Sequence, residues 1–104
     1  MIDIEKIRRE SIRWFILVTL HTAQPVSGET LDTHENIVLS VIKSEYPTAT
    51  QIEIRRELDY LEKRDLVICH KKPNNVWFCG LTRYGIDIVE YTIPVEPGIA
   101  RPEK

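Results

Sequence analysis

Residues 48–85 read TATQIEIRRELDYLEKRDLVICHKKPNNVWFCGLTRYG, and the prediction of the fold rests on this stretch. It begins with a helical pattern that Asp65 interrupts. Leu66–Lys72 and Val76–Leu81 then predict two strands, because both runs contain β-branched or aromatic residues. The Pro-Asn-Asn sequence at 73–75 is typical of a tight turn, since proline fixes φ and asparagine tolerates left-handed backbone. The stretch therefore predicts helix, strand, turn, strand and the start of another helix.

The helix in this stretch has one apolar face, formed by Ile54, Leu58 and Leu61 at helical spacing. Thr48 and Gln51 match a capping box, in which each side chain satisfies a free backbone N–H of the first turn. We therefore expect the helix to begin at Thr48. Charged residues and a tyrosine occupy its other faces.

Upstream of this stretch, residues 4–21 predict a longer helix with two apolar faces. One stripe at helical spacing comprises Ile4, Ile7, Ser11, Trp14, Phe15 and Val18. A second face comprises Ile12, Ile16 and Leu20. A helix that is apolar on two sides needs two partner surfaces. It is therefore either the central helix of a small core or a helix that also pairs with a second copy of the protein.

The segment between these helices predicts a loop at 22–32, with a short β-segment at 29–31. Asp32 or Thr33 then caps a second helix. This helix ends near Glu45, because the Tyr-Pro pair that follows disfavours helical geometry. Its predicted buried stripe comprises Ile37, Val38, Val41 and Ile42. Three to four residues then separate the second helix from the third, which is the spacing of a helix-turn-helix.

The C-terminal part predicts a last helix that Thr82 caps and that ends near Tyr91. Prolines make the final segment an extended tail, because proline cannot continue a helix. The apolar residues between those prolines predict that the tail lies along the body or across a dimer partner. In a homodimer the contact residues would be Ile12, Trp14, Phe15, Ile16, Leu20, Ile93, Val95 and Ile99.

This order of elements predicts an α+β fold, a winged helix-turn-helix. It has a three-helix core, a two-stranded wing, a C-terminal helix and an extended tail. We expect one winged-helix domain over residues 1–92 and the proline-containing tail over residues 93–104.

Two motifs carry a resemblance to known families. RRELDYLEKRDLV, followed by a short hairpin and LTRYGIDIVEY, resembles winged-helix families of the ArsR, MarR and PadR kind. With the tail EYTIPVEPGIARPEK, most of the chain resembles a small winged-helix protein of Mu-like phages and prophages. The resemblance implies a phage-borne protein with a DNA-binding type of fold and no catalytic residue. The metal-binding cysteine motif of many ArsR-type repressors is missing, so metal-responsive repression is not implied.

The composition indicates a single domain, since the chain has 104 residues of which 42% are hydrophobic and 29% charged. No apolar run approaches the ~18 residues of a membrane span. Acidic residues near the N-terminus argue against a cleavable signal peptide. We therefore expect a cytoplasmic protein without a membrane partner. Its net charge of −2 is unusual for a nucleic-acid binder, because counterion release from phosphates favours basic domains.

Binding to double-stranded DNA is the predicted function, through the third helix in the major groove and the wing on the backbone or minor groove. The residues expected to contact DNA are Thr48, Thr50, Gln51, Arg55, Arg56, Tyr60, Lys71 and Lys72. Residues 48–72 contain six basic and five acidic residues, and a dimer would double this small excess. The prediction is a homodimeric transcriptional or accessory regulator. The alternative is an adaptor or assembly module that binds a phage or host protein, with these charges paired on a solvated helix face.

The sequence predicts no enzyme, cofactor or metal site. Glu53 and Glu57 lie four residues apart, as surface carboxylates on helices often do, and no nucleophile–base arrangement accompanies them. The glycines form no phosphate-binding loop. Cys69 and Cys79 lie one on each predicted wing strand, and in a reducing cytosol we expect two free, partly buried thiols.

Overall fold

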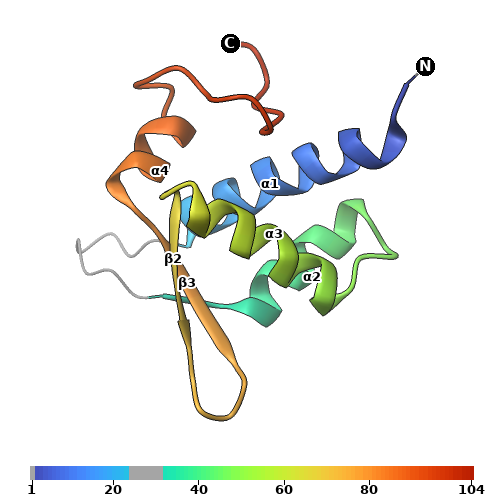
Figure 1. Cartoon of the computed structure of the whole chain (residues 1–104), viewed down its shortest axis with the longest axis vertical. Coiled ribbons are helices and arrows are strands. Elements are labelled where there is room, and N and C mark those ends of the chain that lie inside the picture. The colour runs from blue at the N-terminus through green and yellow to red at the C-terminus, as the bar shows by residue number, and fades with distance from the viewer. Residues whose placement is uncertain (1, 24–31) are drawn as a thin grey trace.

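The computed structural model describes residues 2–23 and 32–104, and it confirms an α+β architecture. The described elements are α1 (Ile4–Thr22), β1 (Thr33–His34), α2 (Glu35–Glu45), α3 (Gln51–Lys63), β2 (Val67–Lys71), β3 (Trp77–Leu81) and α4 (Arg83–Val89). The hairpin of β2 and β3 projects to one side of the helices, and both termini lie on the other side (Figure 1). The predicted β-segment at 29–31, and most of the predicted loop, lie outside the described residues.

The three strands form an antiparallel sheet in the order β1-β3-β2. Asp65 and Asn75 both have positive φ, at 62° and 63°. Asp65 therefore ends the α3 region, and Asn75 closes the turn of the predicted wing, which is the β2–β3 hairpin, as their residue types predict. Thr33 pairs with Cys79, so the short strand before α2 lies along the wing.

Two helix starts differ from the prediction. The N-cap of α3 is Thr50, whose hydroxyl accepts a hydrogen bond of 3.2 Å from the backbone N–H of Glu53. The Thr48 capping box is wrong because residues 46–49 form a turn, in which the Ala49 N–H donates to the Tyr46 carbonyl. The N-cap of α2 is His34, whose Nδ1 accepts from the Asn36 N–H at 3.0 Å. Thr33 belongs to β1 instead.

The core forms where α1 crosses α2, α3 and β3, and its orientation corrects the predicted faces of α1. Ile12, Ile16 and Leu20 are fully buried, whereas Ile4 and Ile7 are 77% and 53% exposed. Both faces have helical spacing, so periodicity could not decide which one turns inward. On α2, likewise, Val38 and Ile42 are buried, but Ile37 and Val41, predicted as part of the stripe, are exposed.

The C-terminal tail folds back along the body of the same chain. Its Ala100 N–H donates to the Glu10 carbonyl of α1 at 3.1 Å. Arg101 donates to the carbonyls of Ile88 and Ile93, both at 2.9 Å. Ile99 is buried in the core. Of the two predicted positions for the tail, the structure shows the one along the body.

Candidate nucleic-acid interface

The outer face of α3 is open to solvent from its first turn to its last. Gln51, Ile52, Arg56 and Lys63 are all exposed there, and Ile52 reaches 80%. Ile54, Leu58 and Leu61 on the opposite face are buried. This division follows from the 3.6-residue period, which leaves the polar positions pointing away from the core.

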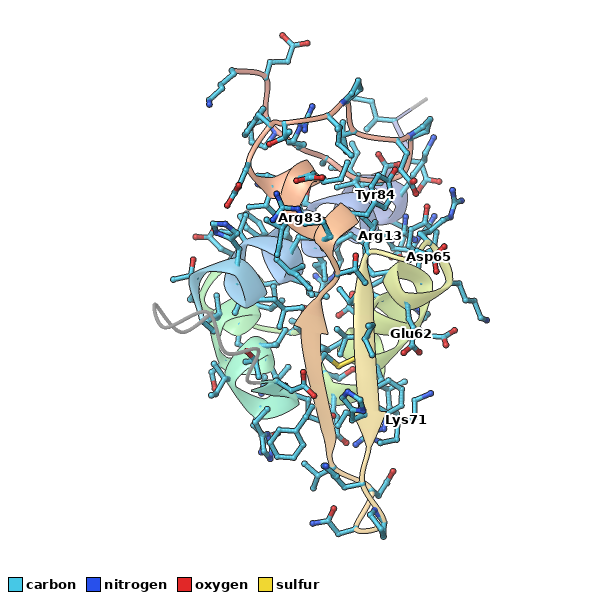
Figure 2. The ribbon with its side chains drawn as sticks, turned by 90° about the vertical axis from the view of Figure 1, so that its left-hand side faces the viewer. Arg13, Glu62, Asp65, Lys71, Arg83 and Tyr84 are labelled. Atoms are coloured by element: carbon cyan, nitrogen blue, oxygen red, sulfur yellow. A yellow bond between two sulfur atoms is a disulfide. The ribbon has the colours of Figure 1, made fainter. Side chains whose placement is uncertain are left out.

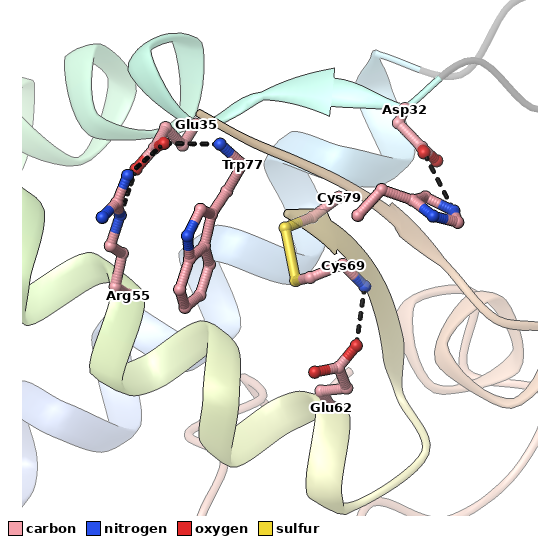
Figure 3. Close-up of a disulfide and its surroundings, with 8 residues drawn as sticks. Asp32, Glu35, Arg55, Glu62, Cys69, Trp77 and Cys79 are labelled. Atoms are coloured by element: carbon pink, nitrogen blue, oxygen red, sulfur yellow. Dashed lines mark hydrogen bonds and ion pairs between the residues drawn. A yellow bond between two sulfur atoms is a disulfide. The ribbon is translucent and has the colours of Figure 1, made fainter. Parts of the chain in front are cut away.

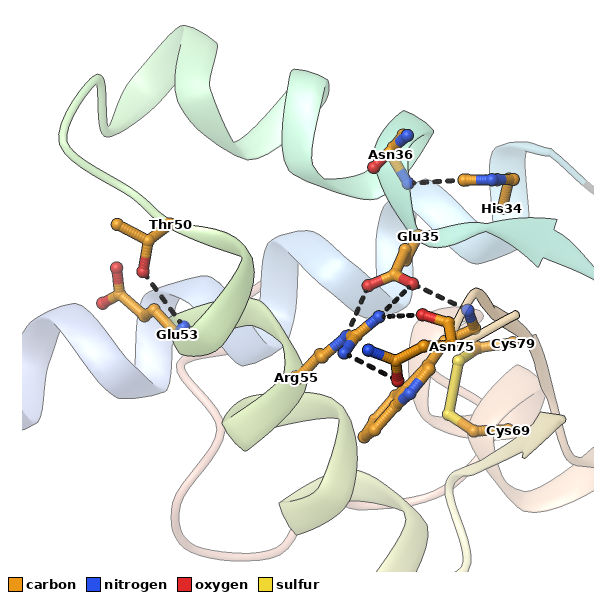
Figure 4. Close-up of polar contacts among 10 residues, drawn as sticks. His34, Glu35, Asn36, Thr50, Glu53, Arg55, Cys69, Asn75 and Cys79 are labelled. Carbon is orange, nitrogen blue, oxygen red and sulfur yellow. Dashed lines mark hydrogen bonds and ion pairs between the residues drawn. A yellow bond between two sulfur atoms is a disulfide. The ribbon is translucent and has the colours of Figure 1, made fainter. Parts of the chain in front are cut away.

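Arg55 lies on the flank of α3 and is bound by three other parts of the chain. Its Nε and Nη2 donate to the two carboxylate oxygens of Glu35 on α2, both at 2.7 Å. Nη2 also donates to the Asn75 carbonyl in the wing turn at 2.6 Å (Figure 4). Its guanidinium lies 4.8 Å from the centre of the Trp77 ring. Its donors are therefore used within the protein, and this geometry lends no support to the prediction that Arg55 contacts DNA.

Glu35 is the acceptor at the centre of this cluster, and it also accepts from the Trp77 N–H at 2.7 Å. Burial raises the pKa of its carboxyl, but the hydrogen bonds from Arg55 and Trp77 outweigh burial and leave the pKa below its ordinary value. The hydrogen bond to Glu35 raises the pKa of Arg55. The pair is therefore ionised at neutral pH and joins α2, α3 and the wing.

Tyr60, another predicted DNA residue, is half-buried and contacts other parts of the chain. The Arg13 guanidinium lies 3.6 Å from the centre of its ring, and the Arg64 guanidinium lies 4.9 Å from it. Tyr60 thus packs between α1 and the tail. The other six predicted residues, which are Thr48, Thr50, Gln51, Arg56, Lys71 and Lys72, are exposed.

The wing carries its two lysines next to aromatic rings. The Lys71 ammonium lies 4.5 Å from the centre of the Trp77 ring, and that of Lys72 lies 5.9 Å from the Phe78 ring. Lys71 lies towards the tip of the hairpin, whereas Arg83 lies at its other end (Figure 2). Both lysines remain exposed.

Most other charges on and around α3 are paired. Arg8 of α1 binds Glu53 at 2.8 Å, and Arg13 of α1 binds Glu57 at 2.8 Å. On α3 itself, Lys63 pairs with Asp59 at 3.0 Å. Arg56 also contacts Glu57, at 3.2 Å, but its side chain is 61% exposed. The surface that could meet a polyanion is therefore small.

Cys69 and Cys79 form a disulfide, which corrects the expectation of two free thiols. They are directly opposite in the register of β2 and β3, and Cys79 is fully buried. The Cys69 N–H points away from β3 and donates to the Glu62 carboxylate of α3 at 2.8 Å (Figure 3). Sequence separation alone could not settle the pairing, because a shift of one residue in register would place the cysteines on opposite faces.

Only part of the predicted dimer interface lies on the surface of the chain, where a partner could contact it. Ile12, Ile16 and Leu20 are buried in the core of the chain itself, and so is Ile99. They cannot contact a partner, which corrects their assignment. Trp14, Phe15, Ile93 and Val95 are partly buried against that core. The predicted interface did not include Ile4 and Ile7, which are exposed apolar residues of α1.

Within residues 2–23 and 32–104, no group of three or more His, Cys, Asp or Glu is arranged to hold a metal ion. No helix in that part of the chain has the length and apolar character needed to cross a membrane. Comparisons of the chain with protein-family models, curated proteins and solved structures found no match. The function must therefore be inferred from the geometry of the residues themselves.

Proposed function

We propose that this protein is a winged helix-turn-helix that binds double-stranded DNA as a transcriptional or accessory regulator. The chain order α1-β1-α2-α3-β2-β3, with the sheet order β1-β3-β2, supports this fold. In it α3 is the recognition helix and the β2–β3 hairpin is the wing. The resemblance of the sequence to winged-helix proteins of Mu-like phages favours a phage-borne role.

The observation that carries the proposal is the attachment of the wing to the recognition helix through Arg55. The contacts of Arg55 with Glu35 and Asn75 hold the wing turn beside the first half of α3. The outer face of α3 and the exposed lysines of the wing are therefore presented as one pre-formed surface. On it Gln51 and Arg56 suit base edges, because Gln pairs with adenine and Arg with guanine, while Lys71 and Lys72 suit phosphates.

A homodimer is part of this proposal, since one copy offers few unpaired cations. The outward stripe of α1 supplies a surface for pairing. Its residues follow the alternating three- and four-residue spacing of paired helices, and they are Ile4, Ile7, Ser11, Trp14 and Val18. Beyond Val18 the apolar surface continues onto Ile37 and Val41 of α2, which line a hollow of about 270 Å³ with it. Two α1 helices packed along this stripe would present two α3 helices to one duplex.

One observation favours the alternative, a protein-binding adaptor. Ile52 is 80% exposed in the middle of the surface that would meet DNA. An isoleucine there contributes apolar contact to a protein partner, whereas in a major groove it would contact only thymine methyl groups.

Fluorescence anisotropy with a mixed-sequence DNA duplex distinguishes DNA binding from the adaptor function. We expect binding at about 50 mM salt that weakens towards about 200 mM, because counterions are released from the phosphates. Lys71→Ala should reduce the salt slope by about one, as expected for one lost phosphate contact. Arg56→Ala should weaken binding in a sequence-dependent way. The matched control is Arg83→Ala, which removes an exposed charge at the far end of the hairpin.

No binding at the lower salt concentration, or an equal loss in the Arg83→Ala control, would contradict DNA binding through this surface. Ile52→Ala provides the complementary test. It should leave non-specific DNA binding unchanged, because an apolar side chain makes no phosphate contact.

A further inference from the structure

A cleft of about 640 Å³ lies where α1, the end of α3 and the C-terminal tail meet. It is separate from the Arg55 cluster, which is on the wing side of α3. Its cationic side chains are Lys6, Arg9, Arg13 and Arg64, and its carboxylates are Glu10 and Glu96. Four positive and two negative charges leave an excess of two in a chain whose net charge is −2. Its volume is within the range of small-molecule sites, ~300–1,000 Å³.

Arg9 is the cation of this cleft that lacks a partner. Arg13 binds Glu57 at 2.8 Å, Arg64 binds Glu96 at 3.3 Å, and the Lys6 ammonium is 4.0 Å from Glu10. Arg9 makes no ion pair or side-chain hydrogen bond with any residue that the structure describes, although it is partly buried.

A second hollow, of about 250 Å³, adjoins the cleft, and Arg9 lines it together with Arg56 and Lys63. Its lining also contains Arg13 and the carboxylates Glu57 and Asp59, which pair with Arg56 and Lys63. Cations outnumber carboxylates by two in this hollow, as they do in the cleft. A partly desolvated guanidinium without a carboxylate partner, in surroundings with an excess of positive charge, favours a bound anion, and its planar fork suits phosphate or carboxylate.

The walls of the cleft are held in place by close contacts. Gly98 has a φ of 99°, and a Cβ at that position would collide with the Tyr60 hydroxyl. Arg13 donates to the Gly98 carbonyl at 2.9 Å while its guanidinium covers the Tyr60 ring. The tail thus contacts α3 through a glycine that no other residue could replace without displacement. The site is pre-formed, so binding would require little ordering.

From these observations we propose that the cleft binds a small molecule carrying a phosphate or carboxylate group, with Arg9 as the principal ligand and Lys6 and Arg64 beside it. A small anion fits better than a DNA backbone. Glu10 and Glu96 lie in the same cleft and would repel a polyanion. They can instead accept hydrogen bonds from hydroxyl or amino groups of a small ligand.

The test is a titration of the ¹⁵N-labelled full chain with inorganic phosphate, followed by amide chemical shifts, with chloride exchanged for phosphate at constant ionic strength. We expect saturable shifts centred on Arg9 and Gly98. Arg9→Gln should weaken phosphate binding at least tenfold and keep the native spectrum elsewhere, because Arg9 has no partner to lose in the described chain. Lys6→Gln should also weaken phosphate binding. Arg83→Gln, at an exposed site on α4, should leave phosphate binding unchanged.

Shifts that rise linearly without saturation, or an Arg9→Gln variant that titrates like the wild type, would overturn the proposal. So would Arg9→Gln weakening duplex binding while phosphate fails to saturate the wild type, since the cleft would then belong to a nucleic-acid surface. The titration contains no DNA, so its result is independent of the DNA-binding function proposed above.

Discussion

At the scale of single residues, Arg55 holds three elements together. Its guanidinium satisfies both oxygens of Glu35, whose side chain is only 3% exposed, and reaches the wing turn at Asn75. A buried carboxylate is costly unless it is paired and hydrogen-bonded. Here Arg55 and the Trp77 N–H meet that requirement. This arginine of α3 therefore stabilises the fold.

Truncation of this arginine should be strongly destabilising. Arg55→Ala leaves the Glu35 charge buried without its partner, and we expect a loss of about 3 kcal/mol in the free energy of unfolding. Chemical denaturation monitored by Trp fluorescence measures this loss of free energy. Adding Glu35→Gln to Arg55→Ala should recover part of the loss, because the uncompensated charge is removed. A change below about 0.5 kcal/mol for Arg55→Ala, the size typical of surface substitutions, would show that the pair is not structural.

Two paired carboxyls predict how stability depends on pH. Hydrogen bonds from Arg8 lower the pKa of Glu53, and the pKa of Glu35 is also below its ordinary value. Their contribution is fully present above the unfolded pKa of about 4.3. It is lost as pH falls through the lower folded pKa, because the unfolded chain then binds more protons. Urea unfolding between neutral pH and pH 3 should show this decline and a shallower one in Glu53→Gln. An unchanged slope in that variant would contradict the assignment.

At the scale of elements, α1 and the wing show what local patterns leave open. The two apolar faces of α1 are equally helical in period, and contacts with α2, α3 and β3 decide which is buried. The two wing strands were predicted from their composition, but the pairing of their cysteines depends on the register that the turn imposes. In both cases the local sequence predicts the type of element, whereas the orientation of the helix and the pairing of the strands depend on distant residues.

The wing disulfide should contribute measurably to stability. It closes a loop with a sequence separation of 10, for which the loss of unfolded-chain entropy corresponds to about 2–3 kcal/mol. Reduction should lower the melting temperature. The double variant Cys69→Ala, Cys79→Ala should melt at the temperature of the reduced protein, and reductant should not change that temperature. Thiol titration of the denatured, unreduced protein counts the free thiols and so shows whether the disulfide forms. Two reactive thiols there would mean that the disulfide does not form.

At the scale of the whole molecule, the proposed dimer depends on the outward stripe of α1. Ile7 lies in this stripe and is 53% exposed, so Ile7→Asp should break the dimer without unfolding the chain. Light scattering at high micromolar concentration should give twice the chain mass for the wild type and one chain mass for the variant. Lys43→Asp, on exposed α2 surface, is the control. A wild-type monomer at those concentrations would end the dimer proposal and weaken the case for DNA binding.

The sequence by itself determined the four helices and the two strands of the hairpin in their order, the turn between those strands and the break after α3, but not β1 at Thr33–His34. These depend on helical period, β-propensity and turn chemistry, which act between near neighbours. Only the tertiary structure decided which face of α1 is buried, that Arg55 binds Glu35, that the cysteines pair and where the tail lies. Each of these depends on residues at least ten positions apart, such as Glu35 and Arg55 or Glu10 and Ala100. A local period carries no information about such partners, since several faces and registers satisfy it equally well.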